Sequence, residues 1–255
     1  MEYYEIRFES CIKIVVKNKR KEIEVSEVKI NKDYIYKEPE EWTERRNTIR
    51  KKQIPIENIT SLIEDGANER EIQKILKSDL SFLSDYLQSP TDEYICLSEL
   101  PIGDDIVDFV VLTSRSRMLV YLIEIKGANF FTAKSSHYKG MNSHIHDAVK
   151  QIGNHVKYIE NNYELFRKYI HNIREQVICG SYKSNHLLGP KGYLDVDPNK
   201  DIKIETIVIG GKSKEDYCDS SERTKFESEH KYWLHVYSWE SFLRRVDKIH
   251  GHYFK

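Results

Sequence analysis

The sequence predicts an α/β fold, and two observations carry this prediction. Short apolar runs typical of buried strands alternate with segments whose apolar residues recur at helical spacing. The opening part of the chain differs, because apolar and charged residues alternate there as in half-buried strands. With 255 residues the chain is long enough for a sizeable core and a small appendage. We therefore expect a small β-rich N-terminal region, residues 1–60, and an α/β domain, residues 61–255.

The strands expected in the N-terminal region are the runs YEIRFES, IKIVVKN, EIEVSEVKI and YIYKE. A basic turn, KNKRK, separates two of them. A second basic run, RRNTIRKK at residues 45–52, holds five Lys or Arg residues among its eight. Two interpretations of these basic runs stay open, a solvated surface and a contact with nucleic acid.

A helix is predicted to follow. Asn68 is a suitable N-cap, and Glu69 and Glu71 lie in the first turn, where the helix dipole favours acidic side chains. The residues that then recur at helical spacing are Ile72, Ile75, Leu76, Leu80 and Leu83.

The remaining elements alternate between strands and helices. We expect strands near residues 94–100, 106–112, 119–127, 202–211 and 233–239, and helices near residues 146–161, 221–230 and 240–249. Residues 163–200 are aromatic and basic, then polar with Gly and Pro, and they predict no definite element.

Composition excludes several classes of protein. The net charge of −1 argues against a globally basic nucleic-acid binder, although a local basic patch is compatible with it. No apolar run approaches the roughly 18–20 residues that span a bilayer, and residues 1–10 lack a secretory pattern. The four cysteines form no CxxC pair, as expected for free thiols in a reducing compartment. We therefore expect a cytoplasmic protein without a membrane partner.

The run LVYLIEIKG, residues 119–127, combines apolar residues on both faces with two opposite charges at its end. Because side chains alternate along a strand, Glu124 and Lys126 are expected on one face. An unpaired buried charge is costly, so a strand that carries these residues needs a compensating partner. That partner is the other charge, water at the strand end, or a metal ion.

The preceding strand, IVDFVVL, contains a single acid, Asp108. If a hairpin turn is centred near Ser116, Asp108 faces Glu124 directly, with Cβ atoms roughly 5 Å apart. Two carboxylates that close repel each other unless one is protonated or a cation bridges them. With Lys126 beside it, this pair predicts a hydrolytic metal centre, and an ion pair at the strand end is the alternative. Another acid-x-Lys run, Glu229 to Lys231, has no acid on an apolar partner strand.

These residues, followed by a helix carrying Gln151 and Tyr158, resemble the PD-(D/E)xK nuclease superfamily. Within it, the chain resembles the nuclease domain of the Shedu anti-phage defence family over roughly residues 66–250. The resemblance lies in NEREIQKILKSDLSFL, IGDDIVDFVVL, LVYLIEIKGAN and the closing TIVIGGK, ERTKFE and LHVYSWESFLRRV. The proline that names the motif is absent, since Val107 precedes Asp108.

The resemblance implies a restriction-endonuclease-like core, a central mixed sheet flanked by helices. It also implies Mg²⁺- or Mn²⁺-dependent cleavage of double-stranded phage or plasmid DNA, a homo-oligomer and a role in phage defence. Two alternatives remain, a repair or junction-resolving nuclease of the same superfamily and a non-catalytic DNA-binding module on the same fold.

The resemblance also implies roles for individual residues. Asp108 and Glu124 would ligate the metal, with the backbone carbonyl of Ile125 as an additional ligand. Lys126 would hold the attacking water or neutralise developing negative charge. Gln151 would lie at the rim of the site, or on a solvated helix face.

A further acid is expected from the helix that begins after Asn68. By helical geometry Glu69 lies closer than Glu71 to the centre of the apolar stripe, so Glu69 is the better candidate ligand. The alternative for Glu69 is complementation of the helix dipole alone.

Overall fold

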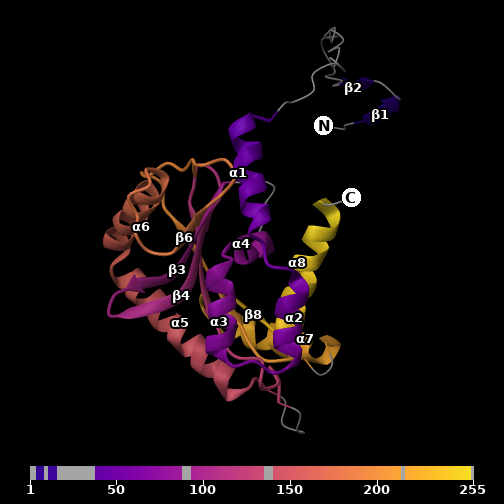
Figure 1. Ribbon diagram of the computed structural model, residues 1–255, viewed down its shortest axis with the longest axis vertical. Helices are drawn as coiled ribbons and strands as arrows, with labels where there is room; N and C mark the ends of the chain where they lie inside the picture. Colours follow the sequence, from indigo (N-terminus) through magenta and orange to yellow (C-terminus); the bar gives the residue numbers. More distant parts are fainter. Residues whose placement is uncertain are drawn as a thin grey trace. The chain divides into compact units, whose positions relative to one another are not determined.

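The computed structural model in Figure 1 describes residues 4–8, 11–15, 38–87, 93–134, 140–213 and 216–253. Contacts divide the chain into two compact units, Met1–Pro39 and Glu40–Lys255. The division therefore falls about 20 residues before the boundary predicted from the sequence, and each unit is described separately below.

The first unit contains an antiparallel pair of strands, β1 (Tyr4–Phe8) and β2 (Cys11–Val15). The other strands predicted before residue 38 lie outside the described residues. Residues 40–60, expected to continue a β-rich region, instead form α1 (Glu40–Lys51) and the start of α2 (Ile56–Glu64). The N-terminal region is thus helical, not β-rich, and this prediction was wrong.

Helix formation in α1 has a physical cause in its sequence. The helix begins with Glu40 and Glu41 and ends with Arg50 and Lys51, so its charges complement the helix dipole at both ends. The basic run of residues 45–52 therefore lies mainly on a helix whose described side chains are all at least partly exposed.

The core of the second unit is a six-stranded sheet in the order β6-β3-β4-β5-β7-β8. Strands β6, β3, β4 and β5 pair antiparallel, whereas β5, β7 and β8 pair parallel, which confirms the predicted mixed sheet. The strands are β3 (Tyr94–Ile102), β4 (Asp105–Thr113), β5 (Leu119–Ile125), β6 (His186–Leu188), β7 (Lys203–Ile209) and β8 (Leu234–Tyr237).

Helices cover both faces of this sheet (Figure 1). One core lies between the sheet and the pair α5–α6, with Leu122 and Ile152 among its buried residues. The other lies beneath α2, α3, α4 and α8 and contains Ile123 and Trp239. After α1 and α2, the helices of this unit are α3 (Glu69–Ser78), α4 (Ser81–Leu87), α5 (Ser143–Asn161), α6 (Tyr163–Ile178), α7 (Asp216–Ser228) and α8 (Trp239–Tyr253). None of the described helices is both long and apolar enough to cross a bilayer.

The β4–β5 hairpin has the predicted register. Phe109 pairs with Ile123 and Thr113 with Leu119, so the two strands are symmetric about Ser116. The turn is also tied to another part of the chain, because Ser116 N–H donates to Asp195 O at 3.0 Å and Ser116 O accepts from Asp197 N–H at 2.9 Å. The end of the hairpin distant from Glu124 is therefore fixed in place.

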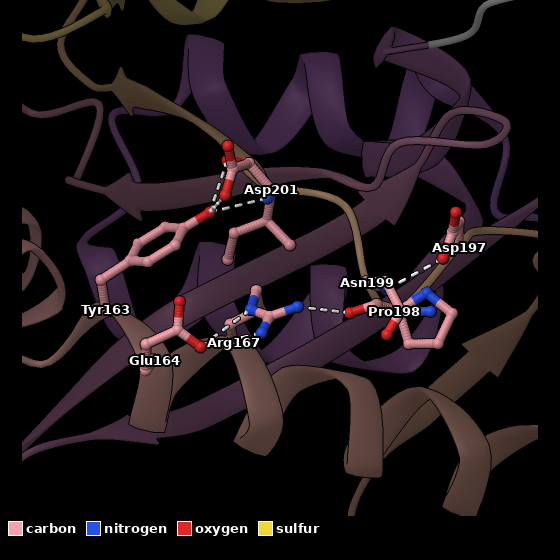
Figure 2. Close-up of polar contacts among 8 residues, drawn as sticks. Tyr163, Glu164, Arg167, Asp197, Pro198, Asn199 and Asp201 are labelled. Atoms are coloured by element: carbon pink, nitrogen blue, oxygen red, sulfur yellow. Dashed lines mark hydrogen bonds and ion pairs between the residues drawn. The ribbon is translucent and has the colours of Figure 1, made fainter.

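The segment that holds this turn is fastened to α6, as Figure 2 shows. Tyr163 Oη accepts a hydrogen bond from Ile202 N–H at 2.9 Å. Arg167 donates to Pro198 O at 2.5 Å and to Glu164 Oε2 at 2.8 Å. Residues 163–200, for which the sequence predicted no definite element, thus supply α6, β6 and a loop that anchors the hairpin.

Candidate active site

Asp108 and Glu124 lie at the same end of the hairpin, as the register predicts. The described ladder reaches Phe109 opposite Ile123, and Asp108 Oδ2 accepts a hydrogen bond from Ile125 N–H at 2.9 Å. Glu124 is fully buried, and neither of its carboxylate oxygens has a hydrogen-bond partner among the described residues. An unsatisfied buried carboxylate is rare in folded proteins, and a bound ion or an ordered water is the usual explanation for one.

Burial and mutual proximity dominate the electrostatics of this pair. Burial, with the neighbouring charge of Asp108, raises the pKa of Glu124 to about 9. Burial likewise raises the pKa of Asp108, while the hydrogen bond from Ile125 N–H and the Lys126 ammonium oppose that rise. The pair therefore favours either a bound proton or a bound cation at neutral pH.

Lys126 lies one residue beyond the end of β5, so strand alternation does not fix the direction of its side chain. Its ammonium is 3.2 Å from Glu69 Oε2, and only 15% of the side chain is exposed. The same ammonium lowers the pKa of both Asp108 and Glu124, so Lys126 and the carboxylates belong to one site.

The two acids at the start of α3 have different positions. Glu69 reaches Lys126, and its charge raises the pKa of Asp108, which places it at the site. Glu71 instead accepts a hydrogen bond from Asn68 N–H at 2.8 Å, while the Asn68 side chain accepts from Glu71 N–H. Glu71 is thus occupied by the capping box, and Glu69 is the acid that α3 presents to the site.

The backbone of Lys126 is fixed on two sides. Lys126 N–H donates to Ile209 O at 2.8 Å, and the indole N–H of Trp239 donates to Lys126 O at 2.9 Å. Trp239 is fully buried, and Gly210 packs so closely that an added Cβ would lie 2.7 Å from Lys126 Cβ. The lysine therefore projects from a backbone held by β7 and α8.

Two residues contact the carboxylates without having been predicted to do so. Gln73 Nε2 donates to Asp108 Oδ1 at 2.5 Å, and Gln73 lies one turn after Glu69 on α3. His155 Nε2 lies 3.8 Å from Glu124 Oε1, with 1% of the side chain exposed. The sequence offers one indication of these contacts, which is spacing. Gln73 follows Glu69 by four residues and His155 follows Gln151 by four, so each shares a helix face with a residue that was predicted at the site.

Gln151, predicted at the rim of the site, is half-buried on α5, one turn before His155. No described hydrogen bond joins Gln151 to Asp108 or Glu124. The structure therefore places Gln151 on the same helix as His155, whose Nε2 lies 3.8 Å from Glu124 Oε1.

The donor set suits a hard divalent cation. Carboxylate oxygens are the ligands that Mg²⁺ prefers, and Mg²⁺ is commonly held by one or two carboxylates together with water and substrate phosphates. Among the described residues, no three or more His, Cys, Asp or Glu side chains converge closely enough to hold a metal. Asp108 and Glu124 thus match a site in which water and substrate phosphates supply the remaining ligands. The unsatisfied Glu124 oxygens are suited to bind the cation.

Comparison with known proteins agrees with this geometry. A family model described as Shedu protein SduA, C-terminal, matches residues 66–243, from just before α3 into α8. The matched segment contains every residue of the site described above. No curated protein gives a match. The chain therefore belongs to the Shedu family, an anti-phage defence nuclease family, through a domain of the SduA C-terminal type.

Proposed function

We propose that this domain is an endonuclease that hydrolyses phosphodiester bonds of double-stranded DNA with Mg²⁺ or Mn²⁺, in defence against phage. The observation that carries the proposal is the buried Glu124 carboxylate, which adjoins Asp108 and Lys126 and whose oxygens have no hydrogen-bond partner in the part of the chain that the structure describes. A purely structural acid in that position would be expected to have its oxygens satisfied by the protein.

Asp108 and Glu124 would hold the cation, with the Ile125 carbonyl as a candidate additional ligand, and Glu69 would act at the site through its ion pair with Lys126. When bound, a divalent cation supplies an acidified water and stabilises negative charge on the phosphate. The protein prepares this site by excluding solvent from Glu124 and by orienting Asp108 between Ile125 N–H and Gln73 Nε2. Hydrogen bonds of this kind to a ligating carboxylate fix its orientation.

Lys126 would contribute a positive charge where the phosphate reacts. Its ammonium is mostly shielded from solvent and lies 3.2 Å from Glu69 Oε2. A fixed ammonium in a shielded site can orient the attacking water or stabilise charge that develops on the phosphate oxygens. The hydrogen bonds from Trp239 and to Ile209 hold the backbone from which this side chain extends.

Cleavage assays with linear and supercoiled DNA test the proposal directly. We expect both Mg²⁺ and Mn²⁺ to support cleavage, EDTA to stop it, and Glu124→Gln to abolish it in a folded protein. Glu229→Gln, in an exposed acid-x-Lys run, is the matched control and should cleave normally. Full activity in EDTA, or in Glu124→Gln, would overturn the assignment.

A further inference from the structure

A cavity of about 530 Å³ lies away from the candidate active site. Its walls come from α1, from the junction of α3 and α4, from the end of α6 and from β6. None of the residues assigned to DNA cleavage lines it. The volume falls within the range of about 300–1,000 Å³ typical of small-molecule sites.

Positive charge dominates the polar part of this cavity. Its lining includes Arg45, Lys52 and Lys77, while the one acidic side chain is Asp79. Asp79 is buried, and its oxygens accept hydrogen bonds from Ile54 N–H at 2.9 Å and from Ser81.

The three cations of the lining differ in their pairing. Lys77 is paired with Glu99 at 2.7 Å. Among the described residues, neither Arg45 nor Lys52 has an acid within ion-pair distance. Two cationic groups at the cavity wall are thus available to an anion.

The wall also has an apolar part. Ile49, Leu187 and Leu188 are only partly buried, and Ile178 is 37% exposed although it belongs to the cavity lining. An inorganic anion would leave this apolar surface in water, and a purely apolar ligand would cover the two cations without pairing them. A molecule with both an anionic group and a flat apolar group satisfies both parts of the wall.

We propose that this cavity binds a free nucleotide, with its phosphates at Arg45 and Lys52 and its base against the apolar wall near Leu187. Such a ligand would connect α1 to the rest of the second unit. Helix α1 has no fully buried residue, and its described contacts include the edge of Trp42 on Tyr193, the Lys191 ammonium 5.3 Å from the centre of the Trp42 ring, and a hydrogen bond from Gln53, just beyond the helix, to Ser81. Nucleotide binding would therefore hold α1 more firmly against the core.

Calorimetric titration of the full chain with ADP tests this proposal. We expect saturable binding of ADP. Adenosine, which lacks the phosphates, and pyrophosphate, which lacks the base, should each bind at least tenfold more weakly. The double variant R45Q/K52Q should bind ADP at least tenfold more weakly. The matched control R50Q/K51Q removes the same charge from the same helix outside the cavity and should bind ADP within twofold of the parent.

Hydrogen exchange supplies an independent readout. ADP should slow amide exchange in residues 40–51 of the parent protein and of R50Q/K51Q, but not of R45Q/K52Q. Absence of saturable ADP binding, or an equal loss in both double variants, would overturn the proposal. Equal binding of adenosine and ADP would also overturn it, because the cations would then contribute nothing. Displacement of ADP by a DNA duplex at equal nucleotide concentration would assign the cavity to DNA instead.

Discussion

His155 Nε2 lies 3.8 Å from Glu124 Oε1, and neither atom has a hydrogen-bond partner among the described residues. Burial lowers the pKa of His155 and raises the pKa of Glu124 to about 9. At neutral pH the metal-free pair is therefore an uncharged imidazole beside an uncharged carboxyl group. A bound cation would convert Glu124 to its charged form.

Glu124 should make the metal-free protein less stable as the pH rises. Its folded-state pKa of about 9 lies above its ordinary value of 4.5, so the folded protein holds an extra proton between these values and the free energy of unfolding falls with pH. From pH 7 to 9 the parent should lose on the order of 2 kcal/mol, whereas Glu124→Gln should not. His155 does not interfere, because it is uncharged throughout that range. Urea unfolding in EDTA measures both slopes, and equal slopes would contradict the assignment.

Lys126→Ala should abolish DNA cleavage while folding and metal binding persist, because an ammonium does not ligate a cation. Removing the side chain breaks its ion pair with Glu69, whose side chain is 40% exposed, and removes a positive charge from beside Asp108 and Glu124 without removing a metal ligand. The matched control is Lys231→Ala, at an exposed position in another acid-x-Lys run. The assignment fails if Lys231→Ala eliminates cleavage in a folded protein and Lys126→Ala does not.

Gln73→Met should weaken metal binding. Gln73 Nε2 donates to Asp108 Oδ1 at 2.5 Å, and loss of such an outer contact typically costs 10–100-fold in affinity or activity. Mn²⁺ titration followed by calorimetry or electron paramagnetic resonance measures the change. Gln176→Met on α6 provides a control at a partly buried position without a described side-chain hydrogen bond. Unchanged Mn²⁺ affinity in Gln73→Met would show that this contact does not orient Asp108.

Trp239→Phe should distinguish the role of Lys126 in cleavage from the role of the two carboxylates in metal binding. The substitution removes the donor to Lys126 O and leaves that carbonyl without its indole partner, at a cost of about 1–3 kcal/mol in stability. Cleavage should fall because Lys126 loses a fixed backbone, whereas Mn²⁺ affinity should change little because Asp108 and Glu124 are untouched. Trp233→Phe, at a residue that is 61% exposed, is the control. A fall in Mn²⁺ affinity equal to the fall in cleavage would contradict this division of roles.

Neutralising the five basic residues of the α1 run should weaken DNA binding. The residues to be changed together are Arg45, Arg46, Arg50, Lys51 and Lys52. Each phosphate contact that is lost should reduce the slope of log affinity against log salt by about 0.9. Filter binding or fluorescence anisotropy over a range of salt concentrations measures the slope. An unchanged slope would assign the run to a solvated surface or to the cavity alone.

The sequence predicted the parts of the site that depend on local pairing. A hairpin fixes the positions of Asp108 and Glu124 through a turn within a single segment, so the register could be inferred from symmetry about Ser116. Glu69 could be inferred as well, because its angle from the apolar stripe of α3 follows from helical geometry.

The contacts that were missed join elements far apart in the chain. Gln73 meets Asp108 only because α3 packs beside β4, and His155 meets Glu124 only because α5 covers that face of the sheet. The error in residues 40–60 has another cause. The runs predicted as strands all end by residue 38, and the region was extended to residue 60 without a strand pattern of its own, whereas the charges at the two ends of α1 favour a helix.

The hydrogen bond from Trp239 to Lys126 O spans 113 positions of the chain. During synthesis the β4–β5 hairpin can form soon after residue 125 is made, since its contacts are local. The backbone of Lys126 acquires its fixed position only after β7 has paired and the start of α8 has been added. A nascent or truncated chain that ends before Trp239 thus carries both carboxylates but an unanchored lysine. Under the proposed function, such an incomplete chain should be able to hold the cation before it can position the lysine.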